Sequence, residues 1–242
     1  MLGHLAVSYM NDQHEFNVKT VSSRWPSDEI MEDIKKSKSD IIINCIGAIP
    51  QKTKDFAVNT QLPRWLEINL PPACRIIHPG TDCEMDDDDY GSSKREASEY
   101  IQNTSDRTRI IQTSIIGPEL SSSAGLFSWF MGEKNNVDGW TKHMWNGNTT
   151  LEWSKQCLNI IKNWEKYSIL TTIEGQRMSK YEVLILIKKI FNKNTEITPV
   201  ETPPVDKCLS GTVKSKALKE QLEDLKNFMF KRKKQYGQYF TA

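Results

Sequence analysis

A tyrosine and a lysine lie four residues apart in the run Tyr90-Gly91-Ser92-Ser93-Lys94. In a helix, side chains with this spacing share one face, about one turn apart. A nearby ammonium favours the phenolate form of a tyrosine, so we expect Lys94 to lower the pKa of Tyr90. Such a tyrosine can give its proton to a carbonyl oxygen while a hydride reaches the carbon. The same spacing also fits a solvated helix start after an acidic loop.

A hydroxyl group precedes this pair in the sequence. Thr81 follows a short apolar run, residues 74–78, that has the composition of a buried strand and is closed by Pro79-Gly80. Open α/β sheets bind their ligands at the carboxyl ends of the parallel strands. The hydroxyl of Thr81 is therefore expected beside a ligand site.

The elements that must position these residues alternate along the first 120 residues. The pattern predicts strands over 40–47, 74–78 and 108–116, and helices over 55–68 and 90–102. Strands and helices in this order indicate a parallel sheet built from right-handed crossovers. The expected fold class is α/β, with a doubly wound sheet.

Helices predominate beyond residue 120. They are expected over 123–132, 149–164, 179–191 and 215–230, with short strands over 168–173 and 196–200. Ser179 is a candidate N-cap, and Pro199, Pro203 and Pro204 are expected in a loop. The predicted organisation is a nucleotide-binding domain over 1–120 and a small, mostly helical substrate lobe over 121–242, with elements that return to the first domain.

Composition excludes several classes of protein. The 242 residues carry 32 Lys and Arg against 31 Asp and Glu, a net charge of +1, which disfavours a polycationic nucleic-acid binder. No apolar run approaches the roughly 18 to 20 residues that cross a bilayer. Five scattered cysteines without a Cys-x-x-Cys pair indicate a reducing compartment and no zinc site. We expect a cytoplasmic protein with no nucleic-acid, membrane or metal partner.

Seven short motifs follow one another along almost the whole chain. They are INCIG (43–47), VNTQLP (58–63), GTDC (80–83), YGSSK (90–94), TSIIGPE (113–119), WNGNTTL (145–151) and PVETP (199–203). In this order they resemble the extended branch of the short-chain dehydrogenase/reductase superfamily. More closely, they resemble the dTDP-4-dehydrorhamnose reductase-like proteins, which act on nucleotide-sugars.

This resemblance implies a Rossmann-type fold and a chemical role for three residues. Tyr90 would be the general acid, Lys94 would tune it and hold the nicotinamide ribose, and Thr81 would hydrogen-bond the sugar carbonyl. The implied reaction is NADPH-dependent reduction at C4 of a nucleotide-linked 4-keto-6-deoxy sugar, in making a surface-polysaccharide precursor. A homodimer is compatible with this assignment.

The resemblance also implies two sets of binding residues. On the cofactor side they are Gly3, Ser23, Arg24, Asn44, Cys45, Ile46, Gly47, Tyr90, Lys94, Ile116, Gly117 and Pro118. The residues Asn44 to Gly47 would line the adenosine and pyrophosphate side of the cleft, and Ile116 to Glu119 would close over the nicotinamide. On the substrate side they are Thr81, Asp82, Glu119, Trp145 and Asn146.

The start of the chain departs from the family pattern. The family opens with a strand and Gly-x-x-Gly-x-x-Gly, whose backbone N–H groups hold the pyrophosphate. Only Gly3 matches, at the last glycine. Either the sequence is an N-terminal truncation of a longer product, which the intact remainder favours, or it is a degenerate member. Because the missing strand is central in the family sheet, its absence is expected to expose the edges of two neighbouring strands.

A second departure is the short loop between Thr81 and Tyr90. It ends in four carboxylates, residues 86–89, which can complement the positive end of the following helix. We interpret them as a solvated acidic turn rather than a metal site. They would oppose ionisation of Tyr90 and repel a pyrophosphate, so the loop indicates weakened catalysis or a changed substrate.

The choice of cofactor depends on residues 17–24, where the second strand is expected to end. An acidic residue at this place binds the ribose of NAD, whereas an arginine accommodates the 2′-phosphate of NADP. Ser23 and Arg24 therefore favour NADP(H) over NAD(H). The alternative is that Arg24 is an exposed loop cation.

Two other functions remain open. One is a nucleotide-sugar epimerase or 4,6-dehydratase of the same superfamily. A dehydratase usually has Asp-Glu after the threonine, and Asp82-Cys83 does not supply this pair. The other is a non-catalytic, regulatory family member, which the missing glycines and the short loop favour and the retained Thr81, Tyr90 and Lys94 disfavour.

Overall fold

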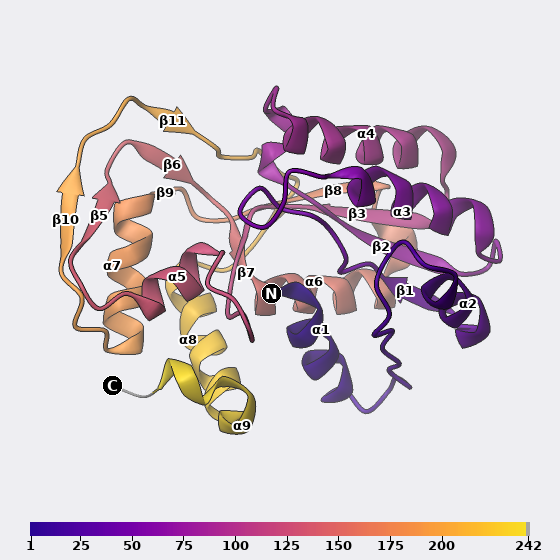
Figure 1. Cartoon of the computed structure of the whole chain (residues 1–242), viewed down its shortest axis with the longest axis horizontal. Coiled ribbons are helices and arrows are strands. Elements are labelled where there is room, and N and C mark those ends of the chain that lie inside the picture. The colour runs from indigo at the N-terminus through magenta and orange to yellow at the C-terminus, as the bar shows by residue number, and fades with distance from the viewer. Residues whose placement is uncertain (241–242) are drawn as a thin grey trace. The chain divides into compact units, whose positions relative to one another are not determined.

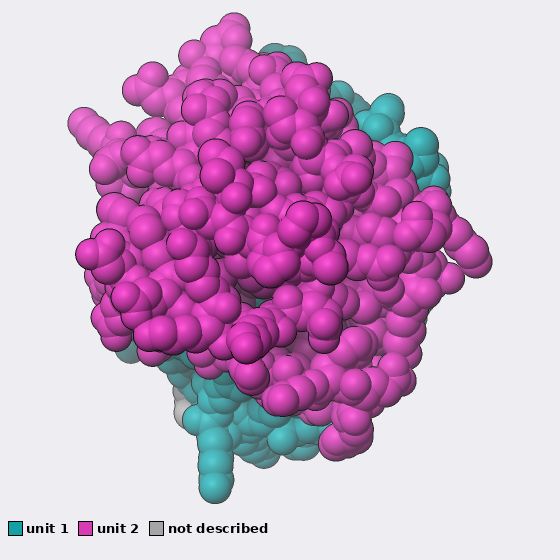
Figure 2. Space-filling model, turned by 90° about the vertical axis from the view of Figure 1, so that its right-hand side faces the viewer, with its two compact units in different colours: residues 1–2, 113–154, 172–242 teal, residues 3–112, 155–171 magenta. Residues whose placement is uncertain are grey.

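The computed structural model describes residues 1–240, which divide into two compact units. The first, here called the sheet unit, comprises residues Gly3–Gln112 and Lys155–Thr171. The second, the C-terminal unit, comprises Met1–Leu2, Thr113–Ser154 and Thr172–Ala242, whose last two residues lie outside the described part. Figure 2 colours the two units separately. The functional boundary expected near residue 120 stays a prediction.

Parallel strands alternate with helices in the sheet unit (Figure 1). Its elements are α1 (Leu2–Asn11), α2 (Asp28–Ser37), β1 (Ile41–Ile43), α3 (Ala57–Asn69), β2 (Arg75–Gly80), the 3-10 helix η1 (Asp82–Met85), α4 (Asp89–Thr104), β3 (Thr108–Gln112), most of α6 (Thr150–Lys162), η2 (Trp164–Lys166) and the start of β8 (Leu170–Glu174). The pairs β1–β2 and β2–β3 are both parallel, and the full sheet has the order β1-β2-β3-β8-β12. The expected parallel α/β sheet is confirmed.

Helices cover both faces of this sheet. In Figure 1, α3 and α4 lie on one side of the strands, and α1 and α6 lie on the other. The apolar residues of α2, α3 and β2 meet in one cluster, in which Ile30, Leu62, Leu66 and Ile76 are almost completely buried. Burying such side chains supplies the main driving force for folding. This two-sided covering is the arrangement that the alternating pattern of the sequence predicts.

The C-terminal unit contains short strands and three longer helices. Its elements are β4 (Ile115–Ile116), α5 (Leu126–Gly132), β5 (Val137–Trp140), β6 (His143–Trp145), β7 (Asn148–Thr149), the end of β8, β9 (Met178–Ser179), α7 (Lys180–Phe191), β10 (Ile197–Val200), β11 (Val205–Asp206), β12 (Val213–Lys214), α8 (Leu218–Phe230), α9 (Lys233–Tyr236) and η3 (Gly237–Tyr239). Ser179 caps α7 as expected, because its Oγ accepts a hydrogen bond of 3.2 Å from the N–H of Glu182.

Among residues 1–240, no helix combines the length and the apolar composition needed to cross a membrane.

Two prolines, Pro79 and Pro199, lie inside strands, whereas the sequence analysis expected the first to end a strand and the second to lie in a loop. The second predicted strand does not stop before Pro79 but continues to Gly80, and Pro199 lies inside β10. A proline is tolerated in a strand where its nitrogen has no ladder partner. The register explains the first case, because β1 ends at Ile43, opposite Ile77, so that Pro79 has a neighbouring strand on one side only. The strand β10 pairs only with β5 in the described chain.

Two other predicted strands are shorter than expected. The run over 40–47 is a strand only at Ile41–Ile43, because the side chain of Asn44 turns the chain by accepting the N–H of Ile46 at 2.9 Å. The run over 108–116 is split into β3 and β4. At the break, the carbonyl of Ser114 accepts the N–H of Asn148 at 2.8 Å, which redirects the chain toward β7.

The strand expected to end near Arg24 is not formed, since residues 12–27 contain no strand. A strand needs a neighbour for its hydrogen-bonding ladder, and β1 is the first strand of the described sheet. The expectation of an exposed edge therefore holds for β1. The other expected neighbour of the missing strand, the segment that ends near Arg24, has no exposed edge because it does not form a strand.

A buried arginine joins the carboxyl end of α3 to the start of β3. The guanidinium of Arg107 lies 3.3 Å from the carboxylate of Glu67, and the side chains of both are about one-tenth exposed. The same guanidinium donates to five backbone carbonyls, those of Leu66, Glu67, Leu70, Pro71 and Cys74. The carbonyls of Leu66 and Pro71 also accept backbone N–H groups. That of Glu67 has no helical partner, because the residue four positions on is Pro71, so Arg107 satisfies a carbonyl that the helix leaves open.

We expect Arg107→Met to lower the free energy of unfolding by about 3 to 5 kcal/mol, because it leaves Glu67 as an unpaired buried charge. Urea unfolding measures the change. Arg64→Met is the matched control, since Arg64 pairs with Glu96 at the surface and its loss should cost less than about 1 kcal/mol. Equal effects of the two variants would contradict the role given to Arg107.

Candidate active site

Thr81 is fixed at the carboxyl end of β2. It caps η1, since its Oγ1 accepts the N–H of Cys83 at 3.3 Å and donates to Oδ1 of Asp82 at 3.0 Å. The backbone N–H of Thr81 donates to Oε1 of Glu84 at 2.8 Å, which completes a capping box. The threonine therefore lies at the sheet edge where the sequence placed it, with its backbone and its side chain both anchored.

The helix α4 begins in direct contact with the backbone of η1. A Cβ on Gly91 would come within 2.3 Å of the carbonyl oxygen of Cys83 and 2.7 Å of that of Asp86. Only glycine allows this approach. Asp88 caps the helix by accepting the N–H of Gly91 at 2.6 Å, and Asp89 lies in the first turn, so the acidic turn complements the helix as expected.

This contact brings Tyr90 to Thr81. The hydroxyl of Thr81 is close enough to the phenol to lower its pKa. The ring of Tyr90 packs edge-on against Phe56, with 5.6 Å between the ring centroids. Burial nevertheless raises the pKa of Tyr90 to about 12, and the nearby Cys83 and Asp82 raise it further. The expectation that Lys94 lowers this pKa is wrong for the structure. Tyr90 is thus fully protonated at neutral pH, the form that a proton donor requires.

Lys94 is directed to the strand rather than to the phenol. Its ammonium donates to the carbonyl of Pro79 at 2.6 Å, and no described contact joins it to Tyr90. Burial lowers the pKa of Lys94 to about 8, against the effect of Glu84, which raises it. The ammonium has two further N–H donors. These are the groups that would hold the hydroxyls of a cofactor ribose.

The segment after β1 lies beside the same end of β2. The N–H of Asn44 donates to the carbonyl of Ile77 at 2.9 Å, and its amide lies 3.2 Å from Nδ1 of His78. His78 is buried, and its burial holds its pKa well below the usual value. Ile46 and Gly47 are exposed.

Asn59 ties this segment to α4. Its side-chain oxygen accepts the N–H of Ala48 at 2.8 Å, and its amide donates to the carbonyl of Ala48 and to Oγ of Ser93, at 3.2 and 3.1 Å. Sequence reasoning included Asn59 in a motif but gave it no role. The available signal was a polar residue at a buried position of an amphipathic helix.

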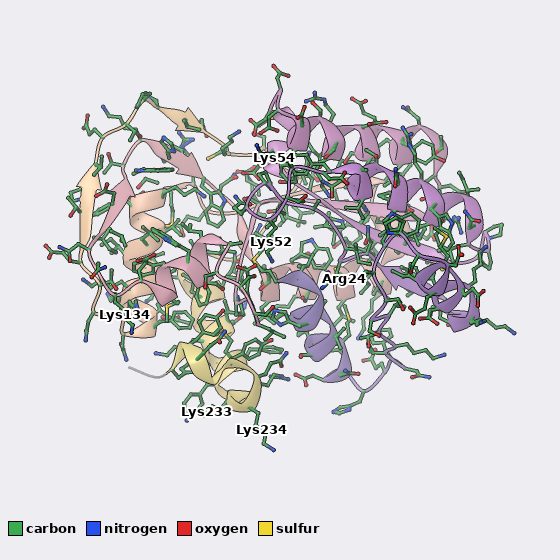
Figure 3. All side chains as sticks on the ribbon, viewed as in Figure 1. Arg24, Lys52, Lys54, Lys134, Lys233 and Lys234 are labelled. Atoms are coloured by element: carbon green, nitrogen blue, oxygen red, sulfur yellow. The ribbon has the colours of Figure 1, made fainter. Side chains whose placement is uncertain are left out.

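The other residues of the sheet unit that were predicted to bind the cofactor differ in their surroundings. A Cβ on Gly3 would lie 3.3 Å from that of Cys45, so α1 packs closely on the segment after β1, as the last glycine of such a loop permits. Burial raises the pKa of Cys45 to about 12, which keeps the thiol neutral. Ser23 is bonded to the carboxylate of Asp33 at 3.1 Å, whereas Arg24 is exposed and no described residue binds it (Figure 3).

The other predicted residues belong to the C-terminal unit. Ile116, Gly117 and Pro118 are buried there, and Gly117 packs against Thr150, whose Oγ1 would lie 2.1 Å from an added Cβ. Glu119 is also buried, and its carboxylate accepts bonds from Ser122 and from the N–H of Gly125.

The two expected substrate residues of this unit are buried as well. The ring of Trp145 is 1% exposed, and Lys180 lies over it at 5.0 Å. The side chain of Asn146 exchanges two hydrogen bonds with the backbone of Leu209, at 2.7 and 2.9 Å. A sugar that contacts Asn146 would have to compete with both bonds, so the substrate role of these residues stays a prediction.

Comparisons with known proteins identify the fold. No protein-family model and no curated protein sequence matches the chain. The solved dTDP-4-dehydrorhamnose reductase of Bacillus anthracis str. Ames, in complex with NADP, is similar with a TM-score of 0.77 at 13% identity, over 95% of each chain. That of Clostridium acetobutylicum has a TM-score of 0.69 at 14% identity, over 95% of this chain and 96% of that chain.

A structure of a different enzyme shares the same fold. The UDP-N-acetylglucosamine 4-epimerase of Bacillus cereus matches with a TM-score of 0.67 at 13% identity, over 95% of this chain and 93% of that chain. The expected Rossmann-type fold is therefore confirmed. Because one fold serves several nucleotide-sugar reactions, the activity must be argued from the site.

We expect Gly91→Ala to lower the free energy of unfolding by about 1 to 3 kcal/mol, because the new methyl group would overlap two backbone oxygens of η1. Chemical denaturation measures this. Gly237→Ala is the matched control, since it has helical dihedral angles and nothing within 4 Å of an added Cβ, and it should change stability by less than about 1 kcal/mol. A neutral Gly91→Ala variant would show that η1 is free to move.

The lowered pKa of Lys94 predicts a pH dependence of stability. Between its folded pKa of about 8 and the ordinary 10.5, the unfolded chain binds more protons at this position, so folding becomes more favourable as the pH rises. The free energy of unfolding of the wild type, relative to Lys94→Met, should rise by up to about 3 kcal/mol across this window. Urea titrations at several pH values test this.

Tyr90 acts in the opposite direction and at higher pH. Its raised pKa contributes stability that is complete below pH 10 and is lost toward pH 12. Because Tyr90 is present in both proteins, its effect cancels from the difference between the wild type and Lys94→Met. A difference that stays constant from pH 8 to pH 10.5 would refute the buried ammonium.

Proposed function

We propose that this protein is an NADPH-dependent reductase of a nucleotide-linked 4-keto-6-deoxy sugar. The observation that supports this best is that Thr81 ends β2 beside the start of α4, which carries Tyr90 and, one turn further along, the buried Lys94 bonded to the carbonyl of Pro79. The three groups lie at the carboxyl end of β2, where open α/β sheets bind their ligands. The shared fold with dTDP-4-dehydrorhamnose reductases supports the same assignment.

The chemistry assigned to each residue follows from its protonation state. When bound, NADPH supplies the hydride. The hydroxyl of Thr81 orients the sugar carbonyl by turning its one O–H from Oδ1 of Asp82 to the carbonyl oxygen. Tyr90, which is neutral at physiological pH, donates its proton to the same oxygen as negative charge develops. The ammonium of Lys94, which binds the carbonyl of Pro79, holds the hydroxyls of the nicotinamide ribose with its two remaining N–H groups and so positions the hydride donor.

The preference for NADPH over NADH rests on Arg24. Its exposed guanidinium has no described partner and suits a 2′-phosphate. The reductase of Bacillus anthracis, which has the same fold, was solved with NADP. Gly3 supplies the close approach of α1 to the segment after β1.

The test combines binding with turnover. We expect tryptophan fluorescence and melting temperature to show saturable binding of NADPH, and weaker binding of NADH. With dTDP-4-keto-6-deoxyglucose, NADPH consumption is expected in the wild type and should fall by about 10²- to 10⁴-fold in Tyr90→Phe, because that variant lacks the proton donor. Its NADPH affinity should change little.

The control is Tyr100→Phe, which removes a hydroxyl from the same helix beside Arg64, away from Thr81. It should turn over at the wild-type rate. Unchanged activity of Tyr90→Phe would overturn the proposed mechanism. NADPH binding without turnover of any keto-sugar would instead support the non-catalytic family member, and interconversion of a nucleotide-sugar without net NADPH consumption would support an epimerase.

A further inference from the structure

A buried carboxylate outside the predicted site residues links the candidate catalytic groups. Glu84, in η1, is 7% exposed. Its Oε1 accepts the backbone N–H of Thr81 at 2.8 Å, and its Oε2 accepts the side-chain amide of Gln112, the last residue of β3, at 3.1 Å. Both oxygens are therefore used, and each holds a different strand end.

The surroundings of Glu84 allow little movement. A Cβ on Gly80 would lie 2.9 Å from Oε1 of Glu84 and 3.0 Å from Cα of Gln112, so the carboxylate fills the space that the glycine leaves. The backbone carbonyl of Glu84 accepts Nη1 of Arg95 at 2.7 Å, and Arg95 also binds the carbonyl of Asp86 at 3.0 Å. Side chain and backbone are thus both fixed.

The charge of Glu84 acts on Lys94. The ammonium is buried and has one described hydrogen bond, to the carbonyl of Pro79. A buried charge needs a counter-charge. Lys94 binds the carbonyl of Pro79, and Oε1 of Glu84 lies against Gly80, the next residue of β2, so this carboxylate is close enough to act on the ammonium. From β2, Lys94 is faced by His78, whose burial holds its pKa well below the usual value, so it stays neutral. Burial raises the pKa of Glu84, and the bond from Thr81 and the charge of Lys94 oppose this rise, so the effect of the two charges is mutual.

We propose that Glu84 is a positioning residue of this site, which fixes the backbone of Thr81 and keeps Lys94 protonated. The carboxylate is not placed to touch a substrate, so it acts through these two groups. Its effect on catalysis rests on the proposed function. Its effect on the charge of Lys94 does not, and this allows the two to be tested separately.

Glu84→Gln is the variant that isolates the charge. An amide of the same shape can still accept the N–H of Thr81, and Gln112 can turn its own amide to pair with it. In the full chain labelled with [¹³Cε]lysine and assigned with Lys94→Met, we expect Lys94 to titrate near pH 8 in the wild type. In Glu84→Gln its midpoint should fall by on the order of one pH unit.

The matched control is Glu99→Gln, which removes an exposed carboxylate from the same helix as Lys94. It should leave the midpoint of Lys94 unchanged. A Lys94 midpoint that does not fall in Glu84→Gln, or that falls equally in both variants, would overturn the inference. This readout needs neither cofactor nor substrate.

A second experiment measures kcat/KM against pH in the wild type and in Glu84→Gln. In Glu84→Gln, the alkaline limb should move to lower pH together with the Lys94 midpoint, a shift that a purely structural role of Glu84 would not produce. A shifted midpoint in a protein without reductase activity would count against the proposed function and leave the coupling in place. A reductase whose pH profile is the same in both proteins would count against Glu84.

Discussion

The contact between Gly91 and the backbone of η1 determines the geometry of the whole candidate site. Because no side chain stands at position 91, α4 begins against the carbonyls of Cys83 and Asp86. From this start, Tyr90 reaches Thr81, and one turn later Lys94 reaches the end of β2. Asn59 fixes the same helix to the segment after β1 from the other side. The ends of β1 and β2 thus meet at the start of one helix.

Burial, more than the pairing of charges, determines the protonation of this site. It raises the pKa of Tyr90 and lowers that of Lys94, so both shifts disfavour the charged form. A tyrosine and a lysine brought close in water would shift in the opposite directions. In the free chain, Tyr90 is therefore a neutral proton donor, and Lys94 is an ammonium that loses its proton more easily than a solvated lysine. A bound anionic cofactor would favour the ammonium, and this would couple binding to the protonation of Lys94.

The order of elements and the positions of Thr81, Tyr90 and Lys94 follow from local patterns, which is why they are readable in the sequence. Apolar runs mark β1 and β2, and the helix spacing places Tyr90 and Lys94 on one face. Glu84 and Gln112 meet only because η1 folds back over the end of β3, and no local pattern encodes that. The expected pKa of Tyr90 was wrong for the same reason, since spacing along a helix says nothing of how deeply a phenol is buried.

The open edge of β1 has a consequence for the behaviour of the protein in concentrated solution. Ile41, Ile42 and Ile43 form a short, half-buried strand whose outer backbone groups have no described neighbouring strand. Such an edge is a template for pairing between molecules. The charged residues just before it, Lys38 and Asp40, are exposed and act as gatekeepers, and the strand is only three residues long. Two charges and a short strand thus limit the pairing that this apolar edge invites.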